Sequence, residues 1–585
     1  MSVPSLPRVS PAQRRATIAR LAALLPDRRD CSDLRGGWST DLLAGVTVAV
    51  VALPLALAFG VASGVGATAG LVTAIVAGAV AAVFGGSNLQ VSGPTGAMTV
   101  VLVPIVADRG VGSVAAIALL AGLIVATAGV LGLGKLVTLI PWPVVEGFTL
   151  GIAVVIAAQQ VPMALGVTKP AGHNAALVAG RAVARFAEHP YVDVLGLLAL
   201  AVVLTAVLPR LHRSLPASLI AVAATTLVLA VIGGADVAVI GDLPRTLPSP
   251  SLPDLSSTLA LLSPALAVAA LVALESLLSA RVADGMVDVQ RHSPNRELVG
   301  QGLANIASSL FGGMPATGAL ARTAVNARTG ARSRLAALSH ALVLAVLMAA
   351  AAGVVSRIPL VALAGVLLVT AYRMVERHAI KAVVRSTHTD ALVFALTAAA
   401  TVVFNLVVAV EIGIVVAVVM ALVHLASTAR LVEDDRPLVE IASDEEHELL
   451  RQHVLVYRLD GPLFFGAASR FLAELTAVSD VRVVVLRLGN LAMLDATGAR
   501  ALSEIIEQFD DRGIAVVLKV SSPAHLKLLG TVGALDRLDR AGHVASDLPA
   551  ALAHARKHAL RGARGPHDHR AGAPEPDPAS WPAAS

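Results

Sequence analysis

The sequence is poor in cysteine and in charged residues, and each shortage excludes a class of protein. Cys31 is the single cysteine among 585 residues, so the chain can form neither an internal disulfide nor a metal site built from several cysteines. Charged residues make up 15% of the sequence and hydrophobic residues 56%. Because soluble domains carry about 25% charged residues, this composition predicts a protein that crosses a membrane several times.

Motifs of enzymatic and nucleotide-driven chemistry are also missing. We find no Walker loop that would bind ATP phosphates and no constellation of catalytic side chains. The first 35 residues are polar and Arg-rich, without the apolar core of a cleavable signal sequence. The net charge of +5 is spread over short loops and termini, which favours loops that flank membrane spans over a nucleic-acid surface. We therefore expect a membrane protein that is not an enzyme and has no cofactor, metal site or nucleic-acid partner.

Hydrophobic runs able to cross a bilayer, which need about 20 residues, occur in two sets of seven. The first set comprises residues 42–59, 66–84, 92–107, 114–133, 144–158, 192–208 and 215–232. The second set comprises residues 261–280, 298–311, 315–327, 335–355, 360–372, 391–407 and 408–425. The loop at 233–257 carries three aspartates against one arginine, whereas the loops predicted on the other side are basic. This asymmetry predicts a multi-pass protein of the cell membrane with both termini in the cytoplasm.

The composition changes along the chain and predicts four parts. We expect a basic cytoplasmic segment at 1–37, an all-α transmembrane domain at 38–428, a cytoplasmic domain at 429–560 and a disordered, Pro-containing tail at 561–585. Within 429–560, strand patterns at 453–459, 481–488 and 514–520 alternate with helix patterns at 498–510 and 523–529. Such alternation predicts a small α/β domain.

Two stretches, Ser92–Thr99 and Met314–Thr323, place Pro and Gly inside hydrophobic sequence at corresponding positions of the two sets. Such interruptions point to the substrate site of a transporter built from inverted repeats. Each break would begin a half-helix near the bilayer midplane, and its free N–H groups and dipole would attract an anion. Arg322 adds a full positive charge that is costly to bury without a partner. The alternative is that the small residues only pack helices together and that Arg322 extends to the membrane interface.

Glu275 lies well inside the span 261–280, and Ser279 follows one helical turn later on the same face. An intramembrane carboxylate is rare and costly, which indicates a function. Two roles are open: Glu275 exchanges a coupling proton, or it binds sodium through oxygen atoms together with Ser279. A third possibility is a fixed counter-ion to Arg322.

Three runs resemble the SulP family of anion transporters: residues 41–60, Ser92-Gly-Pro-Thr-Gly-Ala97 and the segment 315–326. The C-terminal region resembles the family's STAS domain (sulfate transporter and anti-sigma factor antagonist), so the likeness covers about residues 38–558. The resemblance implies fourteen segments in two inverted repeats, divided into a core and a gate domain that work as an elevator in a homodimer. Family members carry sulfate, bicarbonate, chloride or dicarboxylates.

The resemblance also assigns site residues. It implies an anion site near Glu275 that involves Phe59, Thr95, Gly96, Ala97, Gly318, Ala319 and Arg322. Sodium-coupled bicarbonate members have Thr where this chain has Leu320 and Gly where it has Arg322, so the proton-coupled or exchanging branch is favoured. In the STAS domain, Asp495-Ala-Thr-Gly498 resembles a phosphorylation motif, which makes Thr497 a candidate regulatory site. A role as a helix N-cap would also explain why Thr occurs at position 497.

These observations predict secondary active uptake of an inorganic anion, first of all sulfate, by proton symport or anion exchange. The alternatives are a sodium-coupled bicarbonate transporter and a C4-dicarboxylate transporter. From another class, the protein could be a passive anion channel or a membrane anchor for a signalling STAS domain. A cytoplasmic partner of the STAS domain is left open.

Overall fold

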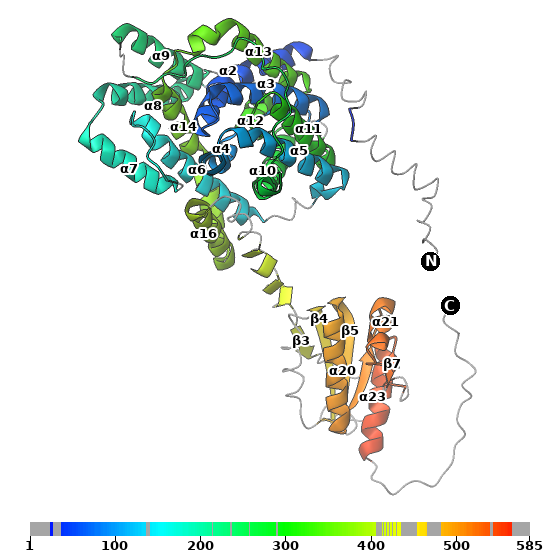
Figure 1. Ribbon diagram of the computed structural model, residues 1–585. Helices are drawn as coiled ribbons and strands as arrows, with labels where there is room; N and C mark the ends of the chain where they lie inside the picture. Colours follow the sequence, from blue (N-terminus) through cyan, green and yellow to red (C-terminus); the bar gives the residue numbers. More distant parts are fainter. Residues whose placement is uncertain are drawn as a thin grey trace. The chain divides into compact units, whose positions relative to one another are not determined.

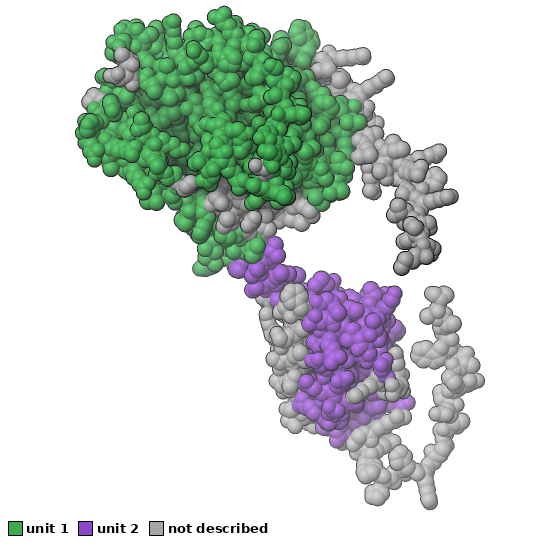
Figure 2. All heavy atoms as spheres, viewed as in Figure 1, with its two compact units in different colours: residues 1–417 green, residues 418–585 purple. Residues whose placement is uncertain are grey.

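The computed structural model describes residues 24–26 and 37–563, except for 136–140, 173, 213–214, 234–236, 257, 288–290, 405–411, 413–414, 417, 421, 424, 427, 429, 434–452, 465–480, 537 and 539–541. The chain forms two compact units, residues 1–417 and 418–585 (Figure 2). Nearly all of the predicted N-terminal segment and the tail beyond residue 563 therefore lie outside the described residues.

The first unit is a bundle of apolar helices interrupted by two short strands (Figure 1). Its first half comprises α2 (Trp38–Ala62), α3 (Ala67–Phe84), β1 (Ser92–Gly93), α4 (Gly96–Arg109), α5 (Gly112–Val130), α6 (Trp142–Ala164), α7 (Ala175–Glu188), α8 (Val192–Leu211) and α9 (Ala217–Ile232). Its second half comprises α10 (Thr258–Asp284), α11 (Pro294–Leu310), β2 (Thr317–Gly318), α12 (Leu320–Arg328), α13 (Leu335–Val355), α14 (Leu360–Met374), α15 (Arg377–Ser386) and α16 (His388–Val403).

Seven helices of the described part are long and apolar enough to cross a membrane, and α9 and α16 are shorter apolar helices. A strand followed by a helix forms the third predicted segment of each half, β1 with α4 and β2 with α12. The predicted polytopic helical fold with two broken segments is confirmed. The last predicted segment, 408–425, lies partly outside the described residues.

Two helices occur where the sequence analysis placed only loops. In α7, Val178 and Ala182 are buried one turn apart while the arginines face outward, and α15 buries only Val383. Two arginines in α7 and three Lys or Arg residues in α15 interrupt the apolar sequence, so neither helix contains an apolar run of spanning length. A search for such runs passes over amphipathic helices of this kind.

Glycines allow the helices of the bundle to approach one another closely. A Cβ atom at Gly70 of α3 would lie 2.1 Å from the carbonyl oxygen of Ala56 in α2. In the same way, a Cβ atom at Gly302 of α11 would lie 2.5 Å from the backbone nitrogen of Ala126 in α5. Helices in membranes associate through such small residues, because lipid supplies no hydrophobic drive for their packing.

The second unit contains a five-stranded sheet in the order β3-β4-β5-β6-β7, in which only the β3–β4 pair is antiparallel. Its described elements are β3 (Arg430–Glu433), β4 (Val454–Leu463), β5 (Val483–Leu494), α20 (Ala496–Asp511), β6 (Ala515–Lys519), α21 (Pro523–Thr531), β7 (Val544–Ala545) and α23 (Leu548–Ala563). Alternate residues of β5 and β6 contact α20 on one face and α23 on the other.

The predicted α/β domain is therefore confirmed, although its edges were not predicted. The short strands β3 and β7 and the helix α23 had no counterpart in the sequence analysis. α23 also continues through Ala563, three residues into the segment expected to be disordered. This helix is held by Ala551, Ala555 and Ala559, which are buried against the sheet but have too little apolar surface to mark a core helix in the sequence.

Candidate functional site

The two interrupted stretches meet inside the first unit. β1 and β2 pair as an antiparallel ladder in which Ser92 lies opposite Gly318 and Gly93 opposite Thr317. The N–H of Ala319 donates to the carbonyl oxygen of Val91 at 2.9 Å and extends the pairing. Because the ladder is antiparallel, the helices α4 and α12 follow from its opposite ends. Both helices contact α10. The predicted meeting of the two breaks is thus observed.

Both half-helices begin with free backbone donors. Thr95 is the N-cap of α4, and its Oγ1 accepts from the N–H of Met98 at 3.5 Å. Ala319 is the N-cap of α12 and offers no side-chain cap. Within the described chain, the N–H groups of residues 96 and 97 and of residues 320 and 321 have no hydrogen-bond partner. These ends carry the positive pole of each helix dipole.

Glu275 of α10 connects the two breaks. Its Oε2 accepts from Thr95 Oγ1 at 2.8 Å and from Thr317 Oγ1 at 2.6 Å. One carboxylate oxygen therefore contacts the cap of α4 and the strand that precedes α12. In the described part of the chain no salt bridge joins Glu275 to Arg322, so the expectation of a fixed ion pair is not met. The carboxyl group of Glu275 instead accepts hydrogen bonds from two hydroxyl groups.

Arg322 is buried, with 2% of its surface exposed. Its Nη2 donates to the carbonyl oxygen of Pro94 at 3.0 Å, whereas its Nη1 has no hydrogen-bond partner in the described structure. A Cβ atom at Gly93 would lie 2.4 Å from Nη1, so the guanidinium group packs directly against the β1 backbone. Arg322 therefore lies inside the bundle, and its Nη1 is a donor without a partner beside the paired breaks.

Apolar side chains from two other helices cover the start of α4. A Cβ atom at Gly96 would lie 3.4 Å from Cε1 of Phe59 in α2 and 2.4 Å from Cδ1 of Ile156 in α6. Phe59 and Ile156 are themselves buried. The predicted Phe59 thus lies beside Gly96, and Ile156 is a neighbour of the site that the sequence analysis missed. A single Ile in an apolar helix gives no sequence signal that it lies beside a binding site.

Ser279, which the sequence analysis paired with Glu275, contacts Thr323 instead. Its hydroxyl donates to Thr323 Oγ1 at 3.2 Å, and the same Thr323 oxygen accepts from the N–H of Val91 at 3.1 Å. One turn earlier on α10, Ser276 Oγ accepts from the N–H of Gly318 at 3.0 Å. These serines fasten the broken segments to α10, while Thr95 and Thr317 supply the hydroxyls at Glu275.

A polar face of α11 supports the same ladder, and the sequence analysis did not identify it. Gln301 Nε2 donates to Ser92 Oγ at 2.6 Å. Asn305 exchanges two hydrogen bonds with the backbone of Ala316, at 2.8 and 2.9 Å. Glu297, Gln301 and Asn305 follow one another at intervals of four, so the signal was a polar stripe on one helix face. Asn305 therefore satisfies backbone groups that the second break leaves unpaired inside the bundle, whereas Gln301 holds the side chain of Ser92 in the first.

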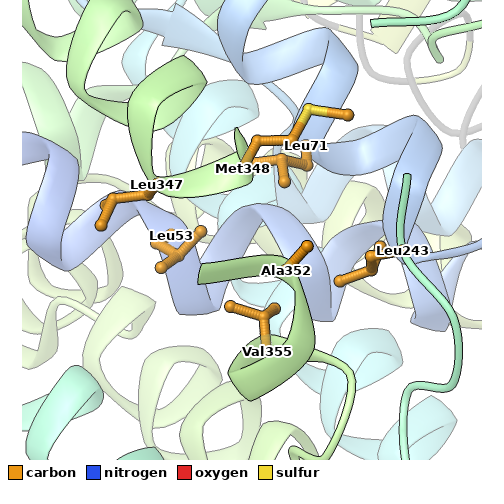
Figure 3. A pocket seen from close by; sticks show the side chains of 7 residues that line it. All are labelled: Leu53, Leu71, Leu243, Leu347, Met348, Ala352 and Val355. Atoms are coloured by element: carbon orange, nitrogen blue, oxygen red, sulfur yellow. The ribbon is translucent and has the colours of Figure 1, made fainter. Parts of the chain in front are cut away.

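A separate pocket in the bundle is lined only by apolar side chains (Figure 3). They come from α2, α3, α13 and the segment before α10: Leu53, Leu71, Leu243, Leu347, Met348, Ala352 and Val355. Such a lining offers no hydrogen-bond donor to an anion. The candidate site is therefore the ladder with its half-helices and not this pocket.

Thr497 of the second unit has a different position from the one expected. The N-cap of α20 is Asp495, whose Oδ1 accepts from the N–H of Gly498 at 2.7 Å. Thr497 lies in the first turn of α20 and is exposed. The expectation that Thr497 caps the helix is wrong because the carboxylate two residues earlier takes that role. Its phosphorylation stays a prediction.

Comparisons with known proteins agree with this architecture. Residues 39–397 match the model of the sulfate permease family, and residues 449–551 match that of the STAS domain. The chain is 34% identical to a putative sulfate transporter, YvdB, of Bacillus subtilis, over 80% of this chain and 89% of that protein. It is 32% identical to the bicarbonate transporter BicA of Synechocystis, over 82% of this chain and 87% of that protein.

Solved structures show the same fold. The transmembrane domain of a cyanobacterial BicA superposes with a TM-score of 0.59 at 32% identity, covering 66% of this chain and 98% of that one. The structure of SLC26A9 superposes with a TM-score of 0.78 at 16% identity, covering 96% of this chain and 98% of that one. The paired breaks, the STAS unit and these matches together show that the chain belongs to the sulfate permease family of anion transporters.

Proposed function

We propose that this protein takes up sulfate by secondary active transport driven by protons. The observation that carries the proposal is the β1–β2 ladder, which brings together two free helix N-termini and the buried guanidinium of Arg322. A dianion bound there would receive hydrogen bonds from backbone N–H groups and would neutralise a charge that is otherwise costly to bury. Phe59 and Ile156 would exclude water from one side.

Glu275 is the proposed proton carrier. Its carboxylate and a sulfate ion would repel each other across the short distance between the ladder and α10. Protonation removes that repulsion, and the proton arrives where Thr95 and Thr317 link the carboxyl to both half-helices. The loaded state would then be less charged and could cross the membrane with the moving core domain, as in an elevator.

Bicarbonate driven by sodium is the second candidate, and one feature favours it. The carboxylate of Glu275 and the hydroxyls of Thr95 and Thr317 form a compact set of oxygen atoms, the ligand type that a hard cation prefers. Leu320 argues against it, because this side chain is 41% exposed at the start of α12 and offers no oxygen. A C4-dicarboxylate remains the third candidate.

Uptake of labelled sulfate into proteoliposomes tests the proposal. We expect saturable uptake that rises when the outside is made acidic, collapses with a protonophore and is unaffected by a sodium gradient. Stronger competition by unlabelled bicarbonate or succinate than by unlabelled sulfate would select the corresponding alternative substrate. Dependence of uptake on sodium would select the sodium-coupled bicarbonate transporter. Large unitary currents in a planar bilayer would indicate a passive channel and contradict the transporter.

The proposal extends to the assembly of the protein. The basic loops favour a cell-membrane protein with both termini in the cytoplasm, and we propose a homodimer. The STAS unit would then face the cytoplasm, where Thr497 is exposed to a kinase or to a protein partner.

A further inference from the structure

Three histidines of the STAS unit, far in sequence from the transport site, face one another. They are His543, just before β7, and His554 and His558 on α23. One ring nitrogen of each lies within 4.8 Å of the others, and the ring centroids are 4.8 to 5.0 Å apart in every pair. All three side chains are half-buried. No contact described for the transport site involves them.

The fold holds the two helical histidines in a fixed position. His554 and His558 are four residues apart, so they lie on the same face of α23. That helix is anchored on the sheet by Ala551, Ala555 and Ala559, which are fully buried. The histidines therefore come from a packed segment, and α23 contacts β7 beside them (Figure 1).

His543 is fixed just as firmly by its backbone. Its N–H donates to the carbonyl oxygen of Leu538 at 2.8 Å, and its carbonyl oxygen accepts from the N–H of Leu518 at 2.8 Å. Its ring also hydrogen-bonds to the backbone of Val516. Metal-binding histidines commonly use one ring nitrogen for such a backbone contact, which orients the other nitrogen toward the metal.

The distance between two of the ring nitrogens matches a metal site. Nε2 of His543 lies 3.2 Å from Nε2 of His558. Two nitrogens bound to one tetrahedral zinc ion at 2.0–2.1 Å would be separated by roughly 3.3 Å.

We propose that His543, His554 and His558 bind one Zn²⁺ ion, with the fourth position open to water or a small ligand. Three imidazoles suit zinc, and the same donors also accept Cu²⁺ or Ni²⁺. The ion would tie α23 to the β7 edge of the sheet. Zinc binding would thus stabilise the last helix of the STAS unit independently of which anion the membrane unit carries.

Zinc titration of the purified, metal-free full chain tests the proposal. The protein used for the titration is prepared without a polyhistidine tag. It carries the substitutions His567→Ala and His569→Ala, so that the tail contributes no zinc ligands. We expect one Zn²⁺ per chain by calorimetry, and Co²⁺ should give the intense visible absorption of a four-coordinate site. His554→Ala and His558→Ala should each weaken zinc binding by about 100-fold or more, because ligands matter at least as much as their outer-shell partners.

His525→Ala is the matched control, because this histidine of α21 lies in the same unit outside the cluster. It should leave the zinc affinity unchanged. Hydrogen exchange supplies a second measurement, in which zinc should slow exchange of the α23 amides in the parent chain but not in the double variant His554→Ala/His558→Ala. Equal zinc affinity of parent and double variant, or no protection of α23, would overturn the proposal and leave three rings that only contact one another.

Discussion

Arg322 is the single residue on which anion binding depends most. Replacing it with Ala should weaken sulfate binding about 10- to 100-fold, because a hydrogen bond to a charged group contributes about 1.5–3 kcal/mol. Arg322→Lys should retain part of the affinity, since it keeps the charge but loses the planar donor pair. Calorimetric titration with sulfate measures both effects.

Arg328 at the exposed C-terminal end of α12 provides the control for this experiment. Arg328→Ala removes the same charge from the same helix without touching the ladder, so sulfate affinity should stay within about 2-fold. An equal loss in Arg322→Ala and Arg328→Ala would show that only the overall charge of the domain matters.

Glu275 allows a prediction about pH. Glu275→Gln keeps the size of the side chain and its contact with Thr95 and Thr317 but removes the titrating group. Sulfate binding should persist, whereas the rate of sulfate uptake should no longer rise when the outside is made acidic. Counterflow of labelled sulfate and gradient-driven uptake, measured in the same liposomes, separate the two effects.

Glu146 of α6 serves as the matched carboxylate, since it contacts Trp142 within its own helix and not the ladder. Glu146→Gln should retain acid-stimulated uptake. Acid stimulation that survives in Glu275→Gln would exclude Glu275 as the proton carrier.

The charged members of the site could be predicted from sequence, whereas its uncharged members could not. Arg322 and Glu275 are conspicuous because a charge in an apolar run is costly. Thr317 and Ser276 carry no such signal, and their roles arise from contacts between residues far apart in the chain. Hydroxyl and amide side chains are common in membrane helices, so only the three-dimensional pairing identifies those that act here.

At the scale of elements, the close contact between β1 and α12 yields a further prediction. Gly93→Ala would place a methyl group 2.4 Å from Nη1 of Arg322. The guanidinium is the far end of a flexible side chain and should shift, so we expect sulfate affinity to fall about 10-fold while the fold is kept. Gly353→Ala in α13, where a Cβ atom meets nothing within 4 Å, should change neither affinity nor melting temperature by much. Unaltered sulfate affinity in Gly93→Ala would argue against a binding role for the guanidinium at its observed position.

The broken elements were predictable because Pro and Gly together interrupt a membrane helix, and the freed backbone groups must then be covered by other protein or line a cavity. The amphipathic helices α7 and α15 were not, since alternating basic and apolar residues also occur in loops between spans. In the STAS unit the central strands carried a clear apolar pattern, but β7 has only two residues and α23 presents mainly alanine to the sheet. Short edge strands and small-residue helices acquire their structure from tertiary packing rather than from their own pattern.

At the scale of the whole molecule, the single cysteine provides a test of orientation. Cys31 belongs to the N-terminal segment predicted to be cytoplasmic. A membrane-impermeant maleimide should therefore label it in inside-out vesicles and not in right-side-out vesicles. In a Cys31→Ser background, Ser249→Cys in the loop between α9 and α10 should show the opposite pattern. Labelling of Cys31 from the outside would reverse the proposed topology.

The most direct measurement of anion binding at the paired breaks is a crystal structure of the protein with selenate, an isostere of sulfate whose selenium is located by anomalous scattering. We expect an anomalous peak beside the β1–β2 ladder, within hydrogen-bonding distance of the N–H groups at the start of α4 or α12 and close to the guanidinium of Arg322. A selenate ion bound elsewhere in the membrane unit, with the ladder empty at saturating concentration, would contradict the proposed site.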